Sequence, residues 1–296
     1  MFKCSTTAHS IFSKKDRVIV IGDLHADYNM TITLFKKLKL IDSNLSWIAL
    51  PKNTFVVQLG DQVDGGGRGN IETTGELQLL NFMEDINVKA GLVGGAVLSL
   101  IGNHEIMNMI GDFRYASNND ITDVGGINMR RKIFLPGSDL FNRLSCTRNV
   151  VVKIGSWVFA HAGILPQHLE EYQGDEFFEK INTLMRLFLQ GKKVLGDSDI
   201  QKYFLMKDGI IWDRDYGSED PSCDKWKEAS NKLGAKFMAI GHTVQPKINA
   251  KCDDSIWRVD VGMSKLFETY NSQVLEILDD GEALPKNNFE PIRVIN

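Results

Sequence analysis

Short apolar runs, each followed by Gly, Asp, Asn or His, recur along the chain and predict buried β-strands. Continuous apolar runs without polar alternation are typical of strands that are covered on both faces. The clearest are Arg17–Gly22, Thr54–Leu59, Ala96–Ile101, Ser156–Ala160 and Lys236–Ile240. Strand character returns near the end of the chain, at Ser255–Val261 and Gln273–Leu278.

Apolar residues at three- and four-residue spacing between the first strands predict amphipathic helices. One stripe consists of Leu34, Leu38 and Ile41, and the next of Leu77, Leu80, Met83 and Ile86. Strands that alternate with helices predict a layered α/β fold. In open α/β sheets the reactive groups gather beyond the carboxyl ends of the strands, so the polar residues at these ends are candidate site residues.

Two segments depart from the strand pattern. Residues 112–148 are rich in Asn, Asp and Arg, and residues 175–207 have a helical pattern of apolar residues. We interpret both as insertions that build walls around the site. The sequence has no internal repeat, low-complexity tract or Pro/Gly-rich linker, which favours a single domain over residues 1–296.

Composition narrows the class of protein. The chain has 296 residues, of which 43% are hydrophobic and 24% charged, as in an ordinary globular protein with a substantial core. Its formal net charge of −4 argues against a protein that coats nucleic acid. Met1–Arg17 lacks the apolar core of a secretory signal, and no apolar stretch is long enough to span a bilayer. These features predict a soluble cytoplasmic protein without a membrane partner.

The four cysteines favour the same compartment. Cys4, Cys146, Cys223 and Cys252 lie far apart and form no C-x-x-C pair. We therefore expect reduced thiols, as is usual in the cytosol, and no disulfide framework.

Histidines are concentrated at the predicted strand ends. Four of the six occupy such positions and have acidic or amide neighbours, giving the set Asp23, His25, Asp61, Asn103, His104, His161 and His242. His9 and His168 lie elsewhere, and we interpret them as ordinary core or surface residues. Imidazole, carboxylate and amide ligands suit divalent Mn, Fe or Zn. The set is too large for one tetrahedral zinc, so two ions that share a carboxylate fit better.

In this order the motifs resemble those of the calcineurin-like metallophosphoesterases. They are Gly22–His25, Gly60–Asp64, Gly102–Glu105, His161–Gly163 and Gly241–Thr243. Their spread resembles the phosphoprotein phosphatase branch. Asn103–Asn108, Gly111–Tyr115 and Gly209–Arg214 are most similar to the Shewanella-like, bacterial-type phosphatases.

The resemblance implies a four-layered α/β/β/α sandwich of two mixed sheets, with two divalent metal ions at the strand ends. Asp23, His25 and a bridging Asp61 would bind one ion, and Asp61, Asn103, His161 and His242 the other. His104 would act as general acid, oriented by Asp64. The implied reaction is hydrolysis of a phosphomonoester by in-line attack of a metal-bridging hydroxide.

The sequence departs from the animal-type pattern at the phosphate-binding arginines. Gly65 occupies the position of the Arg in the second motif, and Leu100-Ile101 stands where another Arg would precede Gly102. Ala26 replaces a Gly after the first motif, which is a milder change. Arg68 and Arg214 are the candidates to bind the phosphate instead, ahead of three arginines of the first insertion, Arg114, Arg130 and Arg131.

The resemblance favours a phosphoprotein substrate, at Ser/Thr or Tyr. The alternative is a dinucleoside-polyphosphate hydrolase or other small-molecule phosphoesterase, because the motif series is similar and the insertions would decide the substrate. A catalytically inactive binding scaffold is the least favoured hypothesis, because all six metal positions and His104 are present. The sequence identifies no regulatory partner.

Overall fold

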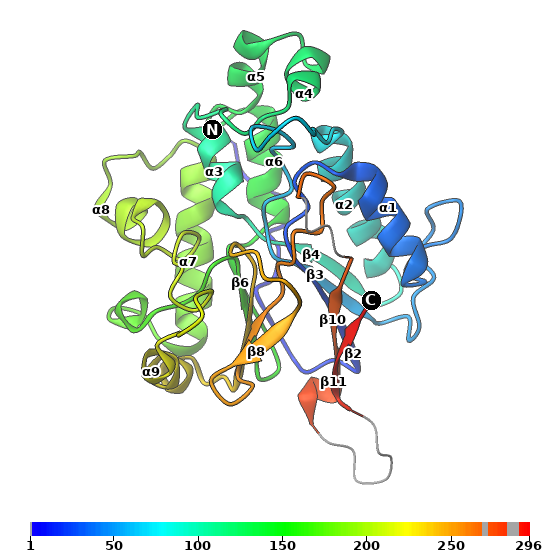
Figure 1. Ribbon diagram of the computed structural model, residues 1–296. Coiled ribbons are helices and arrows are strands. Elements are labelled where there is room, and N and C mark those ends of the chain that lie inside the picture. Colours follow the sequence, from blue (N-terminus) through cyan, green and yellow to red (C-terminus); the bar gives the residue numbers. More distant parts are fainter. Residues whose placement is uncertain (1, 268–271, 283–289) are drawn as a thin grey trace.

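Two β-sheets packed face to face form the centre of the computed structural model, which describes residues 2–267, 272–282 and 290–296 (Figure 1). The strands are β1 Ile11–Phe12, β2 Arg17–Ile21, β3 Phe55–Gln58, β4 Ala96–Ser99, β5 Val151–Ile154, β6 Trp157–Ala160, β7 Phe237–Ile240, β8 Asn249–Lys251, β9 Ile256–Arg258, β10 Val274–Leu278 and β11 Ile292–Ile295. The helices are α1 Tyr28–Lys37, α2 Glu76–Gly91, α3 Asn103–Met109, α4 Asn118–Asp123, α5 Ile127–Ile133, α6 Asp139–Thr147, α7 Gly174–Leu189, α8 Ser198–Ile200 and α9 Cys223–Leu233. The described residues also form three short helical turns, η1 Pro166–Leu169, η2 Gln201–Leu205 and η3 Asp279–Gly281.

The first sheet has the strand order β11-β10-β2-β3-β4. The succession β2-α1-β3-α2-β4 makes its last three strands parallel, with Val20 opposite Val57 and Val57 opposite Leu98. β10 pairs antiparallel with β2. Because parallel strands point the same way, the residues that follow β2, β3 and β4 meet at one edge of the sheet.

The second sheet has the order β1-β5-β6-β7-β9-β8 and is also mixed. β6, β7 and β9 run parallel, and β5 and β8 pair antiparallel with β6 and β9. His161 follows β6 directly and His242 lies two residues after β7, so this sheet also places polar residues at its strand ends.

Helices cover the outer face of each sheet. The helices α1 and α2 share an apolar cluster with Ile19 and Val56 of the first sheet. On the other side α6, α7 and α9 share a cluster with Val158 and Met238 of the second. A third cluster, which includes Val57 and Phe159, lies between the sheets. The predicted four-layered α/β/β/α sandwich of two mixed sheets is therefore confirmed.

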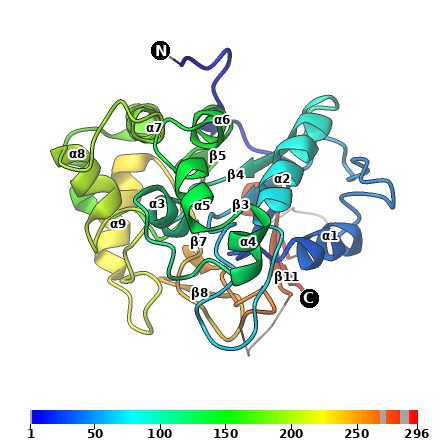
Figure 2. The same cartoon turned by 90° about the horizontal axis from the view of Figure 1, so that it is seen from above.

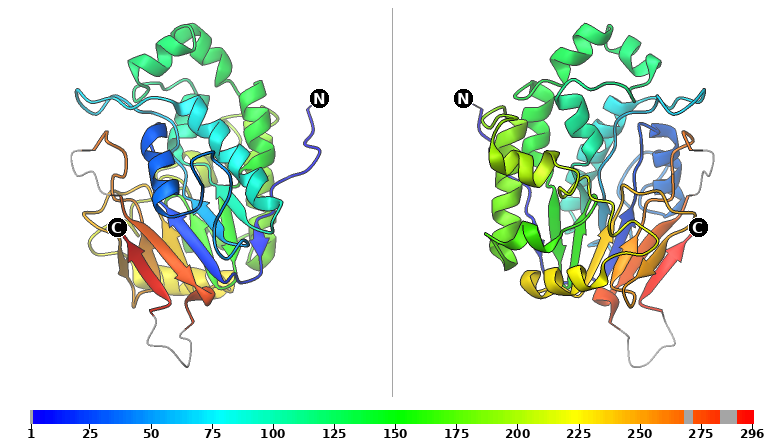
Figure 3. Two further views of the ribbon diagram at one scale, coloured as in Figure 1. Left: turned by 90° about the vertical axis from the view of Figure 1, so that its right-hand side faces the viewer. Right: turned by 60° about the vertical axis from the view of Figure 1, so that its left-hand side comes forward.

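The helices α4 and α5 lie at one end of the sandwich, as Figures 1 and 3 show. Figure 2 looks down on this end, with α3 beside α5. Both helices belong to the predicted insertion at residues 112–148. The helical pattern over residues 175–207 is divided in the structure into α7, α8 and η2.

The expectation of reduced thiols is wrong. The structure pairs Cys4 with Cys146 and Cys223 with Cys252 as disulfides, with Cα–Cα separations of 5.5 and 5.2 Å. Both pairs join segments that are distant in sequence, 142 and 29 residues apart, so spacing along the chain gave no signal for them. Disulfides persist in oxidising surroundings, and the cysteines therefore lend no support to a cytosolic location.

The short edge strands β1, β8 and β11 were not predicted from the sequence pattern. Residues 292–295 pair with β10, so this part of the C-terminal segment belongs to a sheet. Within the described ranges, no helix combines the length and apolar character needed to cross a bilayer.

Candidate active site

The structure brings the polar residues from the ends of five strands into one buried cluster. Asp23 and His25 follow β2, Asp61 follows β3, and Asn103 and His104 open α3 after β4. His161 and His242 arrive from the second sheet. None of these side chains is more than 7% exposed.

Several of these residues have backbone angles that non-glycine residues rarely adopt. The φ angle is 41° at His25, 54° at Asp61, 70° at Asp64 and 66° at His242. Each such conformation costs on the order of 1–3 kcal/mol and persists only where the surrounding structure imposes it. Local backbone preference alone would not place these side chains together.

Two glycines are required by close approach. A Cβ at Gly102 would lie 2.2 Å from Oδ1 of Asp61, and one at Gly241 would lie 2.5 Å from Oδ1 of Asp23. Atoms at these separations clash, so both motifs need Gly for their carboxylates to fit.

Asp61 lies at the centre of the cluster. Its Oδ1 accepts the backbone N–H of His104 at 2.8 Å, and its Oδ2 lies 3.3 Å from Nε2 of His161. The same His161 nitrogen is 2.9 Å from Oδ1 of Asn103, while Nδ1 of that ring bonds the backbone oxygen of Leu59 at 2.8 Å. The Leu59 contact leaves Nε2 of His161 facing Asp61 and Asn103.

Asp23 is held by the backbone of His242 and lies near the His161 ring. Its carboxylate accepts the backbone N–H of His242 at 3.2 and 3.3 Å, and its Oδ1 lies 3.9 Å from Nδ1 of His161. Burial, followed by the nearby Asp260 carboxyl, holds the pKa of Asp23 well above its usual range. A buried carboxylate of this kind requires a nearby positive charge to remain ionised.

The pKa values of the other candidate ligands favour the charged form for some residues and the neutral form for others. Burial opposes ionisation of Asp61, but His161 and His104 outweigh it and hold the pKa of Asp61 well below its usual range. Burial likewise disfavours protonated His161, yet Asp61 and Asp23 raise its pKa to about 10. Burial lowers the pKa of His242 to about 2 and that of His25 well below its usual range. Neutral imidazole is the form that binds metal.

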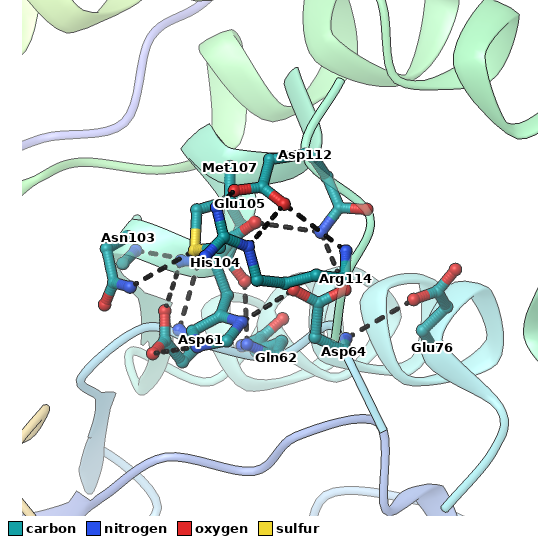
Figure 4. A network of polar contacts seen from close by, with 12 residues as sticks. Asp61, Gln62, Asp64, Glu76, Asn103, His104, Glu105, Met107, Asp112 and Arg114 are labelled. Carbon is teal, nitrogen blue, oxygen red and sulfur yellow. Dashed lines mark hydrogen bonds and ion pairs between the residues drawn. The ribbon is translucent and has the colours of Figure 1, made fainter. Parts of the chain in front are cut away.

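His104 has both ring nitrogens engaged. Nδ1 lies 2.6 Å from Oδ2 of Asp64, and Nε2 lies 2.9 Å from Nη2 of Arg68. Figure 4 shows Asp64 on one side of His104, with Asn103 and Asp61 on the other. An arginine can only donate, so Nε2 is the accepting nitrogen and Nδ1 carries the proton toward Asp64.

Side-chain distances define two groups of potential metal ligands. One atom each from His25, Asp61 and His104 lie within 4.8 Å of one another, and so do atoms from Asp61, His161 and His242. Asp61 belongs to both groups, as a bridging ligand would. The first group differs from the predicted set, in which Asp23 and not His104 joins His25. The existing partners of His104 favour the predicted set.

The donor set suits divalent cations. It combines imidazole nitrogens, carboxylate oxygens and one amide oxygen, all buried. Nδ1 of His25 is buried and has no hydrogen-bond partner among the described residues. Together with the unbalanced Asp23 carboxylate, this indicates that the cluster is built to receive cations.

The two predicted phosphate arginines both reach this cluster. Arg68 contacts His104, and its Nη1 is buried without a partner in the described part of the chain. Its guanidinium carbon lies 4.5 Å from the ring centroid of Tyr115 and 5.5 Å from that of Phe267. Arg214 donates to the backbone oxygen of His242 at 3.3 Å and to Oγ1 of Thr243 at 3.2 Å.

The weaker arginine candidates lie elsewhere. Arg114 pairs with Asp112 and is largely exposed, and Arg131 is exposed on α5. Arg130 is fully buried and contacts Asp64, Asn108 and Glu76. It therefore lies on the Oδ1 side of Asp64, whereas His104 contacts Oδ2 of the same carboxylate.

Sequence reasoning assigned no role to two buried carboxyls that support the cluster. Glu105 accepts the backbone N–H groups of Asp61, Gln62 and Gly102 at 3.0, 2.7 and 2.8 Å, which ties two strand ends together. Asp260 lies beside Asp23, and burial raises its pKa to about 6. Glu105 is the last residue of the Gly102–Glu105 motif, and Asp260 lies near the end of the predicted strand Ser255–Val261, so motif membership and strand-end position were the available signals.

Comparison with known proteins gives consistent matches. A sequence model for the family described as calcineurin-like phosphoesterase matches residues 16–246. The Shewanella-like protein phosphatase 2 of Arabidopsis thaliana is 30% identical over 316 aligned residues, covering 91% of this chain and 77% of that protein. The Shewanella-like protein phosphatase 1 of Plasmodium berghei is 28% identical, covering 86% and 68% of the two chains.

Solved structures share the fold. The cold-active protein-tyrosine phosphatase of a psychrophilic Shewanella species superposes with a TM-score of 0.78 at 24% sequence identity. The superposition covers 93% of this chain and 79% of that one.

Proposed function

Because this chain belongs to the calcineurin-like phosphoesterase family, and is therefore a metal-dependent phosphoesterase, we propose that it is a protein phosphatase. It would hydrolyse phosphomonoesters at the strand-end cluster, within one catalytic domain formed by residues 1–296. The observation that carries the proposal is the His104–Asp64 pair, which lies beside the two groups of potential metal ligands. This pair leaves one imidazole nitrogen facing Arg68.

Six residues would hold two divalent ions, namely Asp23, His25, Asp61, Asn103, His161 and His242. Such ions supply positive charge for the phosphoryl oxygens and make a bound water acidic enough to react near neutral pH. The protein holds these ligands in place beforehand: Glu105 fixes the backbone at Asp61, and the Leu59 carbonyl fixes the His161 ring.

His104 would supply the proton for the leaving oxygen. Its Nδ1–H faces Asp64, so the ring is held in one orientation and Nε2 is the nitrogen left to carry a second, transferable proton. Asp64 is fully buried, and its Oδ2 lies 2.6 Å from Nδ1 of that ring. General acids of this kind contribute on the order of a hundred- to ten-thousandfold to the rate, most where the leaving group is poor.

Arg68 and Arg214 would bind the phosphoryl oxygens. Arg68 already lies beside the reactive nitrogen of His104. Its guanidinium would therefore pass from that nitrogen to a phosphoryl group bound next to it. The partner-free Nη1 of Arg68 offers a further donor. Guanidinium groups suit this task because their donors match the spacing of phosphate oxygens.

A phosphoprotein is the substrate class that we favour. Two similar proteins are protein phosphatases, and the solved structure that shares the fold is that of a protein-tyrosine phosphatase. The aromatic rings of Tyr115 and Phe267 flank Arg68 beside the reactive nitrogen. Rings at this position give a stacking surface to an aryl leaving group, which favours phosphotyrosine over phosphoserine or phosphothreonine.

A substrate panel with Mn²⁺ present tests this function. Phosphotyrosine and phosphoserine/threonine peptides, an aryl phosphodiester and diadenosine tetraphosphate are compared at equal concentration, with Asp61→Asn as the control for activity at this site. We expect turnover of the peptides, fastest for phosphotyrosine, and none in Asp61→Asn. Preference for the dinucleotide would refute the protein phosphatase proposal, and absence of any turnover would refute the proposed phosphomonoesterase reaction.

A further inference from the structure

A charged cluster lies fully buried behind His104. Its central residue is Arg130 of α5, whose side chain is 0% exposed. The guanidinium lies 4.5 Å from the ring centroid of Phe134 and 5.4 Å from that of Phe113. Packing on both rings fixes the plane of the guanidinium, so its donors point in set directions.

Arg130 uses those donors on the side chains that support the proposed acid. Nη1 and Nη2 bond the two carboxylate oxygens of Glu76, the latter at 3.0 Å. Nε and Nη2 bond Oδ1 of Asn108 at 3.1 and 2.6 Å. Nη2 also lies 3.4 Å from Oδ1 of Asp64. One guanidinium thus contacts three side chains from three different segments.

The contact with Asn108 determines which way its amide points. Oδ1 accepts from Arg130, so Nδ2 is turned toward Asp64 and donates to its Oδ1 at 2.8 Å and to the backbone oxygen of His104 at 2.9 Å. Asp64 is then left with Oδ2 for Nδ1 of His104, at 2.6 Å. A continuous chain of hydrogen bonds leads from Arg130 through Asn108 and Asp64 to His104.

Arg130 also places a positive charge between two buried carboxyl groups. Asp64 and Glu76 are both buried, and Glu76 lies 3.5 Å from the backbone nitrogen of Asp64 (Figure 4). Burial raises the pKa of Glu76 to about 7 even with Arg130 bonded to it. Removal of the guanidinium would leave two carboxyl groups in a dry environment without a cation between them, which favours displacement or neutralisation of one of them.

We propose that Arg130 is a positioning residue for His104, acting through Asn108 and Asp64. Through Arg130, the insertion helix α5 would help to orient the acid, in addition to forming a wall of the site. This inference rests on the proposed role of His104 as proton donor. This role differs from phosphate binding, for which Arg130 was a weaker candidate in the sequence.

The test compares leaving groups. kcat/KM is measured for aryl phosphates from 4-nitrophenyl phosphate, whose leaving group needs little protonation, to phenyl phosphate, whose leaving group needs more. Arg130→Met is the variant, Arg130→Lys the conservative rescue, and Arg131→Met the matched control on the exposed face of the same helix. Melting temperature and Mn²⁺ content show that each variant is folded and loaded.

We expect Arg130→Met to lose about ten- to a hundredfold on phenyl phosphate and much less on 4-nitrophenyl phosphate, as supporting residues of a catalytic group do. Arg130→Lys should recover part of the loss, and Arg131→Met should match the unmodified enzyme. A purely structural role would lower all substrates equally. An unchanged leaving-group dependence in folded, metal-loaded Arg130→Met would overturn the proposal.

Two further variants keep the test decisive. Asn108→Leu cuts the link to Asp64 while Arg130 keeps its bonds to Glu76, so it should show the same signature, and it carries the test if Arg130→Met does not fold. His104→Asn defines the signature of a lost acid. If His104→Asn shows no steeper leaving-group dependence, the proposed acid itself is refuted and the Arg130 role with it. If only His104→Asn shows it, the Arg130 proposal alone fails.

Discussion

Metal binding at this site should release protons, because at least one of the buried candidate ligands is protonated when no metal is bound. In the metal-free protein Asp61 and Asp23 raise the pKa of His161 to about 10, although burial opposes this. His161 is therefore protonated at pH 7, whereas a metal ligand must be neutral. Removal of that proton at three units below its pKa costs about 4 kcal/mol, at about 1.36 kcal/mol per unit.

The cost of deprotonation falls as the pH rises toward 10, so metal affinity should increase about tenfold per pH unit for each proton displaced. His161 contributes one proton, and the raised pKa of Asp23 adds up to one more. We expect release of about one to two protons per chain at pH 7.

Titration calorimetry with Mn²⁺ in buffers of different ionisation enthalpy measures this number. His161→Asn should lower the release by about one proton, the one that His161 contributes. His242→Asn is the matched control, because burial holds the pKa of His242 near 2 and it has no proton to lose at pH 7. That variant should bind metal more weakly yet still release protons. Metal affinity that is flat between pH 6 and 8, or equal release in both variants, would refute the reasoning.

Three other perturbations have definite expected outcomes. Arg68→Ala should raise KM for phosphopeptides about ten- to a hundredfold, measured by steady-state kinetics, whereas Arg114→Ala, on an exposed side chain, should not. Cys223→Ser opens a disulfide across 29 residues and should cost about 3–4 kcal/mol in the free energy of unfolding, measured by denaturant titration; a change below about 1 kcal/mol would contradict it. Gly102→Ala sets a methyl group 2.2 Å from Asp61 and should abolish Mn²⁺ binding by calorimetry, and a fully loaded variant would show that the loop relaxes.

The sequence predicted the layers of the fold well for a physical reason. Buried parallel strands require unbroken apolar runs, and β2, β3, β4, β6 and β7 each have one. The edge strands β1, β8 and β11 are short and only partly buried, so their sequences are not under the same constraint. The disulfides also gave no signal, because each joins cysteines that only the folded chain brings together.

The candidate site shows the same division. Strand ends converge at one edge of each sheet, so position alone brought Asp23, Asp61 and His161 together as candidates. The supporting role of Arg130 was not predicted, because it depends on contacts with Glu76 of α2 and Asn108 of α3 that only the folded chain makes. In the sequence it stands beside Arg131 with the same charge, yet one side chain is buried against Asp64 and the other is exposed.

The metal content of His104→Asn tests the central claim most directly, namely that His104 is the proton donor and Asp23 completes the ligand set. Metal analysis of the purified variant, beside Asp23→Asn and the unmodified protein, separates the two roles. We predict that His104→Asn retains the full metal content of the unmodified protein while turnover of phosphopeptides falls sharply, and that Asp23→Asn loses metal. A His104→Asn variant depleted of metal, with Asp23→Asn fully loaded, would contradict the account.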